Sequence, residues 1–471
     1  MDFDPEEFDV LLGNYRHGNM DQVTDDRVVV IDESPSSAFQ EEYTHDEVVR
    51  IVSNFLGNHD EIPFDNYTDL TESRSDPYQS HDAKKWFDEN YPDLTPDSCE
   101  VMTSRNTEVH AKAPLLTYAL LVGEELGNGW EQAILGDERF AARNRNLKPE
   151  NDFLELVLLL PPSFDGAQTV IGLDGTPCVE QWELCLGHSV KYHRVLNDTE
   201  RGLYIKDVLN QRIYQMNKGS KPYSSGKYVN LPDDKALITQ VGERERQRPD
   251  LITSRKAIGQ YRTDGVLDFV GEHNYFGNIT GSNDFGHSRL GLVIGSPHYG
   301  GDYLKKWGAF AGVKVERIGD GRGMDLTYGS FGNKLLEEMR EGGVIQSIMR
   351  FGRDGDGATI FVSTGAIPDW VPIAGKGGIK RWSKGTKLVL NAIKNRGEWK
   401  TRDLLTEVEE RKGKVLDTDE PELISERQVK RNLDTLVEYG FITRHTEGNG
   451  IVWEDCCLED VPADRYVFYE K

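Results

Sequence analysis

Short apolar runs recur along this chain, and each ends in a polar or glycine-containing turn. The clearest is Val28–Ile31, four consecutive β-branched residues that lead into Asp32 and Glu33. Leu290–Ile294, which leads into Gly-Ser-Pro, has the same form. Continuous apolar runs of this length are typical of strands buried on both faces of a parallel sheet. Further predicted strands are Leu154–Leu160, Thr169–Leu173, Lys235–Val241, Asp250–Ser254 and Ala358–Ser363.

Segments with helical spacing of apolar residues separate these runs. They include His45–Leu56, Ala113–Leu126 and Gly332–Arg340. Alternating strands and helices predict an α/β fold with a doubly wound parallel sheet. In such sheets ligands bind at the carboxyl ends of the strands. The polar turns that follow the apolar runs are therefore candidate sites.

Asp32 and Glu33 lie at the predicted carboxyl end of the first strand. There Asp32 could bind Mg²⁺ directly or through water, and Glu33 could activate an attacking water molecule. An ordinary acidic turn after a strand would have the same two residues, and both interpretations stay open.

The segment Gln346–Arg353 joins a helical pattern to the run Ala358–Ser363. It contains Arg350 and Arg353, and Arg353 directly follows a glycine. A guanidinium group on such a turn is suited to bind phosphate, because its planar fork makes paired hydrogen bonds and stays charged. In nucleotide hydrolases an arginine of this kind stabilises charge on the transferred γ-phosphoryl group. The alternative is a solvated basic turn.

The C-terminal residues 388–471 have the pattern of three helices followed by a β-hairpin. Ser425 and Gln428 form a capping-box sequence at the start of the third helix. This pattern resembles a winged helix-turn-helix domain, whose third helix enters the major groove of DNA. The residues expected to contact nucleic acid are Arg427, Gln428, Lys430 and Arg431 on this helix, Arg444 in the wing, and Lys380 and Arg381 in the basic stretch that precedes the domain. The alternative is a winged helix that binds protein and has a solvated basic face.

The charge of the chain is unevenly distributed. The whole chain carries a net charge of −25, whereas residues 376–471 hold 18 basic and 19 acidic side chains, which leaves −24 for residues 1–375. An acidic surface opposes generic nucleic-acid binding, so the nearly neutral C-terminal part is the place where DNA is expected.

Cysteine spacing and hydropathy give no sign of a zinc site, a disulfide framework or a membrane span. The five cysteines contain no Cys-x-x-Cys pair. The N-terminal residues are acidic, unlike a secretory signal, and the longest apolar run is far shorter than a bilayer requires. We therefore expect a soluble, cytoplasmic protein without membrane contact.

Taken in order, these stretches resemble the motor core of a superfamily II helicase. Val28–Ser34 resembles the Walker B motif, and Leu173–Pro177 resembles the motif that couples hydrolysis to movement on nucleic acid. Ile252–Ala257 and Gly281–Pro297 resemble the fourth and fifth motifs. Gln346–Arg353 matches the sixth motif, except that Met349 replaces a usual glycine.

The resemblance implies ATP and Mg²⁺ as cofactors and assigns roles to seven residues. Asp32 would bind the metal ion, Glu33 would orient water, and Arg353 would be the arginine finger. Gln346 and Arg350 would lie beside Arg353, and Asp174 and Thr176 would take part in coupling.

One motif of the family is missing from the chain. The phosphate loop G-x-x-x-x-G-K-[S/T] occurs nowhere in the sequence. Its amide groups and lysine normally bind the β- and γ-phosphates. Either a second polypeptide supplies the phosphate loop, or the chain is a shortened relative, or hydrolysis has been lost.

These observations predict two RecA-like lobes and a C-terminal winged helix. The predicted parts are a partial first lobe at 1–189 with a mostly helical insertion at about 36–165, a second lobe at 190–374, a basic linker at 375–387, and the winged helix-turn-helix domain at 388–471. The predicted function is a DNA-binding, nucleic-acid-dependent ATPase or translocase, or a subunit of one, in DNA replication or repair. The alternative is a non-enzymatic regulator of replication or transcription with a degenerate helicase core.

Overall fold

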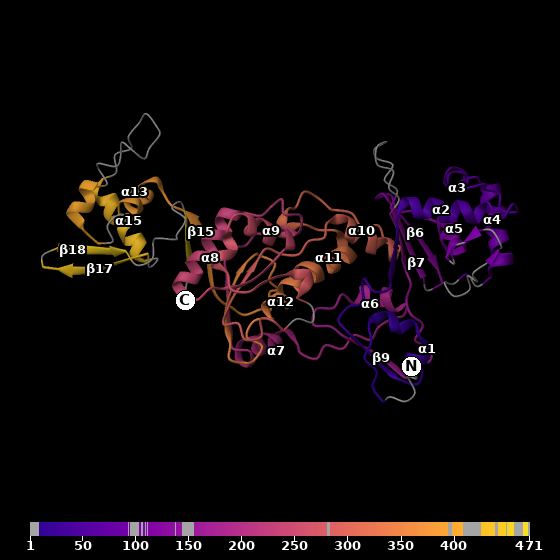
Figure 1. Cartoon of the computed structure of the whole chain (residues 1–471), viewed down its shortest axis with the longest axis horizontal. Coiled ribbons are helices and arrows are strands. Elements are labelled where there is room, and N and C mark those ends of the chain that lie inside the picture. Colours follow the sequence, from indigo (N-terminus) through magenta and orange to yellow (C-terminus); the bar gives the residue numbers. More distant parts are fainter. Residues whose placement is uncertain are drawn as a thin grey trace. The chain divides into compact units, whose positions relative to one another are not determined.

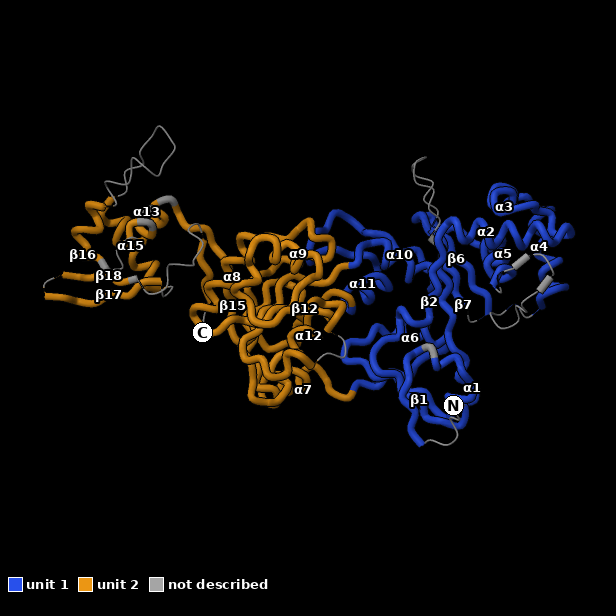
Figure 2. Tube along the Cα trace, viewed as in Figure 1, with its two compact units in different colours: residues 1–194, 299–338 blue, residues 195–298, 339–471 orange. Residues whose placement is uncertain are grey.

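A computed structural model of the chain shows a mixed α/β protein (Figure 1). The chain forms two compact units, residues 1–194 with 299–338 and residues 195–298 with 339–471, called unit 1 and unit 2 below (Figure 2). The structure describes residues 9–92, 94, 103–104, 107–108, 110, 112–136, 138–143, 155–279, 283–393, 398–407, 425–438, 441–448, 450–455 and 465–469.

Unit 2 is built on a seven-stranded sheet. Its order is β12-β11-β13-β14-β10-β15-β19, in which all neighbours are parallel except the last pair. This sheet confirms the predicted parallel α/β architecture. The strands are β10 (Gln211–Gln215), β11 (Asp250–Thr253), β12 (His273–Tyr275), β13 (Leu290–Ile294), β14 (Ala358–Ser363), β15 (Ile373–Arg381) and β19 (Arg465–Tyr469).

Helices cover the sheet of unit 2. They are α8 (Leu231–Glu245), α9 (Arg255–Thr263) and α12 (Gly343–Ile348), whereas α7 (Asp198–Leu203) precedes β10 and has no buried residue. The prediction of a strand at Lys235–Val241 is wrong, because these residues lie within α8. Asn230 caps this helix by accepting a hydrogen bond from the Asp233 amide (3.4 Å). Leu237, Ile238 and Val241, spaced for one helix face, are fully buried. A seven-residue segment with four apolar side chains does not by itself distinguish this helix from a strand.

Unit 1 contains a two-stranded parallel sheet. Its strands are β1 (Val28–Asp32) and β9 (Thr169–Leu173), and α6 (Val179–Leu186) packs on one face of it. The prediction that Val28–Ile31 is buried on both faces is wrong. Val28 and Val30 are each 54% exposed, whereas Ile31 is buried against Trp182 and Leu186. Alternate residues of a strand point to opposite faces, and only one face is covered among the described residues.

The insertion between β1 and β9 is only partly helical, which corrects the predicted mostly helical insertion. It contains the antiparallel sheet β2-β8-β7-β6-β5, and the predicted strand at Leu154–Leu160 belongs to this sheet as β8. Its strands are β2 (Gln40–Tyr43), β5 (Glu124–Glu125), β6 (Trp130–Leu135), β7 (Glu138–Arg143) and β8 (Glu155–Leu159), and β3 (Thr103–Ser104) and β4 (Thr107–Glu108) form a separate pair.

Four helices form a core with this antiparallel sheet. They are α2 (His45–Leu56), α3 (Tyr67–Ser73), α4 (Pro77–Asn90) and α5 (Ala113–Val122). Helix α10 (Gly301–Phe310) contacts β6 and β7, and α11 (Gly329–Glu337) follows it in unit 1. The predicted helix His45–Leu56 is confirmed at both ends, with a complete capping box at Thr44 and Glu47.

The C-terminal part has three helical segments and a hairpin, as predicted. These are α13 (Lys384–Ile393), residues 401–407, α15 (Glu426–Glu438), β17 (Ile442–Glu447) and β18 (Gly450–Asp455). A short strand, β16 (Glu398–Lys400), pairs with β18 and was not predicted. Val429, Leu433 and Leu436 of α15 are buried in a core with the residues of α13.

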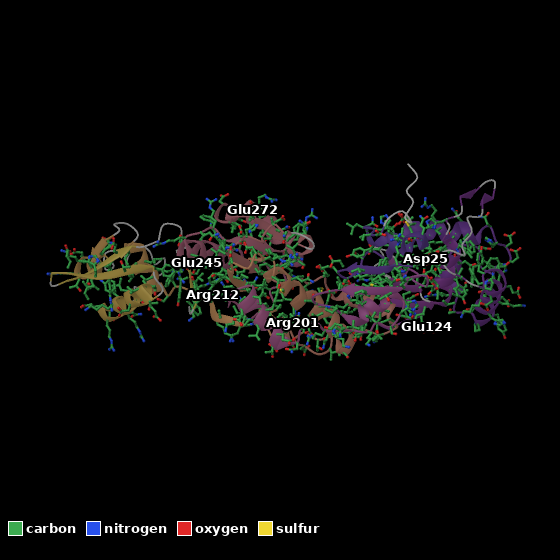
Figure 3. All side chains as sticks on the ribbon, turned by 90° about the horizontal axis from the view of Figure 1, so that it is seen from below. Asp25, Glu124, Arg201, Arg212, Glu245 and Glu272 are labelled. Carbon is green, nitrogen blue, oxygen red and sulfur yellow. The ribbon has the colours of Figure 1, made fainter. Side chains whose placement is uncertain are left out.

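The stretch predicted as a basic linker, 375–387, is instead largely strand. Strand β15 continues to Arg381, and it pairs with β19 from the end of the chain. Helix α8 holds β19 through Arg465, which donates to Asp233 Oδ1 at 2.5 Å, and Tyr469, which donates to Glu245 Oε1 at 2.7 Å (Glu245 is labelled in Figure 3). Strand β19 therefore joins the C-terminal part of the chain to the α/β sheet of unit 2.

No helix in the described part of the chain is long and apolar enough to cross a membrane.

Candidate functional site

The parallel pairing of β1 and β9 brings two predicted site segments together in unit 1. The strands pair in register, with Asp32 opposite Leu173. Asp32 at the end of β1, Glu33 directly after it, and Asp174 directly after β9 therefore lie at the same carboxyl edge. This is the edge at which parallel sheets bind ligands.

The backbone at this edge is tightly held. The Glu33 amide donates to the Leu173 carbonyl at 2.7 Å, and Tyr15 donates its hydroxyl to the Asp32 carbonyl at 2.5 Å. Glu33 has a φ of +68°, a left-handed conformation that is uncommon for a residue other than glycine. Backbone strain of this kind is concentrated at functional sites.

The surroundings of the Tyr15 hydroxyl show that acidic side chains gather at this edge. Burial, followed by the carboxylates of Glu33, Asp32 and Asp174, raises the pKa of the Tyr15 hydroxyl. Sequence reasoning missed Tyr15, because it lies outside every motif and nothing in its neighbours marks it. Three carboxylates near one phenol make this edge strongly negative.

Asp174 is fixed by two hydrogen bonds. Its carboxylate accepts from the Thr176 amide at 2.8 Å and from Trp182 Nε1 at 3.0 Å. Gly172 allows this arrangement, because a Cβ there would lie 2.6 Å from the Trp182 ring. Burial and the nearby Asp174 carboxylate raise the pKa of Glu338 to about 7. Trp182 and Glu338 were not predicted as site residues.

The side chain of Asp32 is suited to a hard cation. It is exposed and forms no ion pair within the part of the chain that the structure describes. Among the described residues no three His, Cys, Asp or Glu side chains are arranged to hold a metal ion together. A magnesium ion bound through one carboxylate, with water and phosphate as its other ligands, fits this arrangement.

The predicted arginine segment lies in unit 2 as α12 and the turn before β14. Gln346 is half-buried on α12, and Arg350 is only 7% exposed. Arg353 is exposed and donates from Nη1 to Asn283 Oδ1 at 3.4 Å. Of the two predicted arginines, Arg353 is therefore the one that is open to a ligand.

The turn that carries Arg353 is anchored in the core on one side. Phe351 is fully buried against Phe285, with ring centroids 5.4 Å apart. Its carbonyl accepts a hydrogen bond from Gln211 Nε2 at 2.6 Å. Gly291 of β13 leaves room for the ring, because a Cβ there would lie 2.8 Å from it. Gly352, with φ +61°, donates its amide to the Phe285 carbonyl at 3.3 Å.

Helix α15 places the predicted nucleic-acid residues on its exposed face. Arg427, Gln428, Lys430 and Arg431 are all exposed, and Val429 between them is buried. Ser425 caps the helix by accepting from the Gln428 amide at 3.3 Å. Lys430 is paired with Glu426 at 2.7 Å, whereas neither arginine forms an ion pair within the described residues.

The remaining predicted nucleic-acid residues lie on strands. Arg444 is exposed on β17, where Nη1 contacts Asp434 Oδ1 at 3.0 Å. Lys380 and Arg381 are exposed near the end of β15, and Lys380 Nζ lies 4.3 Å from the centre of the Phe468 ring. Of the predicted fifth motif, residues 281–282 lie outside the described residues.

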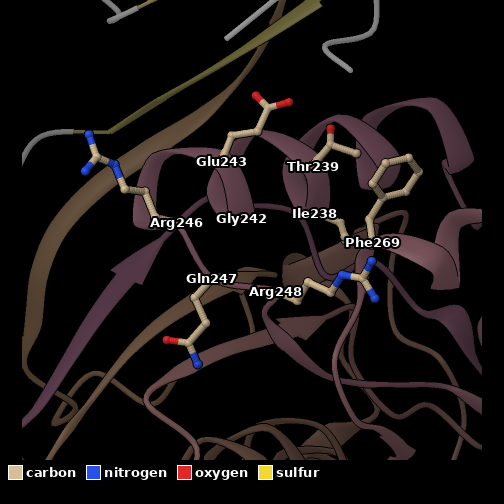
Figure 4. Close-up of a pocket in the computed structure, with 8 residues that line it drawn as sticks. All are labelled: Ile238, Thr239, Gly242, Glu243, Arg246, Gln247, Arg248 and Phe269. Carbon is tan, nitrogen blue, oxygen red and sulfur yellow. The ribbon is translucent and has the colours of Figure 1, made fainter. Parts of the chain in front are cut away.

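Unit 2 also has a pocket of about 290 Å³ at the end of α8. Ile238, Phe269, Arg246 and Arg248 are among its lining residues, and the side chains of the two arginines point in different directions (Figure 4). A larger groove of about 510 Å³ lies in unit 1 beside Tyr328 and Phe331. Neither contains a predicted site residue.

Comparison of this chain with protein families, with curated proteins and with solved structures finds no match.

Proposed function

We propose that this chain is a DNA-binding, helicase-like protein that acts as a nucleic-acid-dependent ATPase or translocase, or as a subunit of one, in DNA replication or repair. The observation that carries the proposal is the turn of Arg353. An exposed arginine follows a buried phenylalanine on a turn anchored to β10 and β13, so its position is fixed before any ligand arrives. Preorganised charges of this kind stabilise the transition state of phosphoryl transfer.

The acidic edge of unit 1 supports the same proposal. Asp32 would bind Mg²⁺ and Glu33 would orient the attacking water, while Asp174 and Thr176 would couple turnover to nucleic acid. The pairing of β1 with β9 places both segments at one edge, as this division of roles requires. Gln346 and Arg350 would assist Arg353 in binding ATP.

A second polypeptide would supply the phosphate loop. The support is the apolar face of β1 and β9, on which Val28, Val30, Ile171 and Leu173 are 41–54% exposed. A two-stranded parallel sheet with one open apolar face is unusual, because parallel sheets are normally covered on both faces. A strand and helix carrying the loop would cover this face. ATP turnover by the purified chain alone would contradict the need for such a partner.

The exposed face of α15 would bind duplex DNA. Arg427 and Arg431 have no acidic partner among the described residues, so their charge is available for phosphates or base edges. Lys430 and Arg444 would first have to leave Glu426 and Asp434. Lys380 and Arg381 on β15 would add further contacts to the phosphates.

Fluorescence anisotropy with a labelled duplex tests two parts of the proposal, DNA binding by α15 and the effect of ATP on that binding. The Arg427→Ala/Arg431→Ala variant is expected to bind about 10-fold or more weakly and to show a smaller salt dependence. Lys84→Ala/Lys85→Ala, on the exposed side of α4, removes the same charge and is the control. Addition of ATP and Mg²⁺ is expected to change the affinity of the wild type but not that of Arg353→Ala.

The second candidate is a non-enzymatic regulator of DNA replication or transcription. The solvent-exposed basic face of α15 favours it, since DNA binding by this helix needs no nucleotide. DNA binding that depends on α15 but is indifferent to ATP, also when the polypeptide that supplies the phosphate loop is present, would overturn the motor proposal in favour of this one. Binding equal in the α15 variant and the wild type would overturn both.

A further inference from the structure

The turn that carries Arg353 is rich in glycine. Gly352, Gly355 and Gly357 have φ values of +61°, +88° and +84°. Glycine loses more conformational freedom on ordering than any other residue, so such a segment needs external contacts to hold one shape. Phe351 anchors the turn before Arg353, but it does not restrain the residues after Arg353.

Arg289 supplies the restraint on the other side. It directly precedes β13, and its guanidinium binds both carboxylate oxygens of Asp354, with Nη1 2.8 Å from Oδ1 and Nη2 2.5 Å from Oδ2. Nη1 also donates to the Gly357 carbonyl at 3.2 Å, and Nη2 lies 3.2 Å from Asp356 Oδ2. A two-pronged pair of this kind fixes direction as well as distance.

The backbone around the pair completes the restraint. The Arg289 carbonyl accepts from the Thr359 amide at 2.9 Å, and Asp354 donates its amide to the Gly286 carbonyl at 3.4 Å. His287, which is highly exposed, places Nδ1 2.8 Å from Asp354 Oδ2. The Arg289 guanidinium, with a smaller effect from His287, holds the pKa of Asp354 well below its usual range. Asp354 therefore stays ionised at neutral pH, and the pair stays formed.

We propose that Arg289 and Asp354 are positioning residues that hold the Arg353 guanidinium in the geometry needed to contact the γ-phosphate of a nucleoside triphosphate. This inference rests on the proposed function. Arg353 is joined directly to Asp354, so the turn has a core anchor on one side of the arginine and an ionic clamp on the other. Loss of the clamp leaves Arg353 on a glycine-rich turn fixed at one end only. Neither Arg289 nor Asp354 touches the phosphate.

Two measurements on the full chain test the clamp. Hydrogen exchange followed by mass spectrometry measures the rigidity of residues 352–357. Steady-state kinetics with ATP, Mg²⁺ and DNA, with the polypeptide that supplies the phosphate loop added where turnover requires it, measures catalysis. Arg289→Gln and Asp354→Asn are each expected to speed exchange in this segment and to lower kcat by about 10- to 100-fold with little change in KM. The double variant is expected to be no worse than either single variant, because both remove the same clamp. Arg289→Lys, which keeps the charge but loses the fork, is expected to be intermediate.

Asp356→Asn is the matched control. It removes the same charge from the same turn, but Asp356 is 80% exposed and touches Arg289 at only one point. An effect on kcat equal to that of Asp354→Asn would show that charge, not the clamp, is responsible and would overturn the proposal. Unchanged exchange in Arg289→Gln would overturn it as well, as would faster exchange with unchanged kcat while Arg353→Ala lowers kcat.

The failure of the proposed function gives a different result. If the wild-type chain binds DNA but hydrolyses no ATP, either alone or together with the polypeptide that supplies the phosphate loop, the catalytic purpose of the clamp is refuted together with the motor. The exchange data then describe only the stability of the turn.

Discussion

The substitution Gly291→Ala tests how the core positions the Arg353 turn. A Cβ at Gly291 would lie 2.8 to 2.9 Å from three ring atoms of Phe351, so the ring would have to move by about 0.6 Å to reach an ordinary contact of 3.4 Å. Phe351 is fully buried against Phe285 and its carbonyl is held by Gln211, so little space is available for that movement.

Overpacking of this kind costs about 1–3 kcal/mol in unfolding free energy. Each kcal/mol lowers the Tm of a domain of this size by about 2–4 °C, so thermal unfolding followed by circular dichroism is expected to shift down by about 2–12 °C. Gly259→Ala in α9 is the control, because a Cβ there meets nothing within 4 Å, and it is expected to be neutral or slightly stabilising.

The double variant Gly291→Ala/Phe351→Leu makes the test specific. A smaller side chain at position 351 makes room for the new Cβ, so the two substitutions together are expected to cost less than the sum of their separate effects. Strict additivity, or a Gly291→Ala protein that unfolds at the wild-type temperature, would refute the reasoning that Gly291 admits the Phe351 ring.

Three further predictions concern stability. The pKa of Glu338 is raised to about 7, above the ordinary value of 4.5, so the folded protein keeps a proton that the unfolded chain loses and the unfolding free energy falls as pH rises between about 4.5 and 7. The Tm of Glu338→Gln is therefore expected to fall less than that of the wild type over this pH range, and identical profiles of Tm against pH for the two proteins would contradict this prediction. Arg244→Ala is expected to cost about 1.5–3 kcal/mol in urea unfolding, because Arg244 Nη2 donates to the Val467 carbonyl at 2.6 Å and its guanidinium lies over the Phe441 and Tyr469 rings. Arg248→Ala, which replaces an exposed arginine lining the pocket in Figure 4, is its control. Equal losses of unfolding free energy in the two variants would contradict the inference that Arg244 stabilises β19. Gly352→Ala is expected to lower Tm, since alanine at a φ of +61° is strained and its Cβ would lie 2.9 Å from the Gly357 carbonyl carbon, whereas an unchanged Tm would refute that strain.

Local pattern was sufficient to predict three strands of the unit 2 sheet, β11, β13 and β14, and the C-terminal helices, but not β10, β12, β15 or β19. Strands such as Leu290–Ile294 are buried along their whole length, so their apolar runs carry a strong signal. Helix α15 has both a cap at Ser425 and an apolar stripe. The error at Lys235–Val241 arose because a seven-residue segment with four apolar side chains fits either a strand or a helix.

Long-range pairing could not be predicted from the sequence. Nothing local assigns Leu154–Leu160 to an antiparallel sheet, or joins residues 373–381 to the last strand of the chain. The open face of β1 was also missed, because a run of valines does not show whether anything covers them.

The predicted site residues were chosen from motifs, and the residues that hold them in place were not. Arg353 was found because arginine after glycine on a turn is a recognisable pattern. Arg289, which contacts the neighbouring Asp354, is 65 residues away in the sequence, and Tyr15 is 17 residues from Asp32. Such partners become visible only when the sheet brings them together.

The most direct test of the account is ATP hydrolysis by the purified chain with and without DNA. Wild type is compared with Glu33→Gln and Arg353→Ala, and with Arg262→Ala as an exposed-arginine control in α9. DNA-stimulated turnover is expected, from the chain itself or once the partner polypeptide is added, and it is expected to be lost in Glu33→Gln and Arg353→Ala and kept in Arg262→Ala. Turnover that survives both substitutions, or DNA binding that is unaffected by ATP in a chain without turnover, would contradict it.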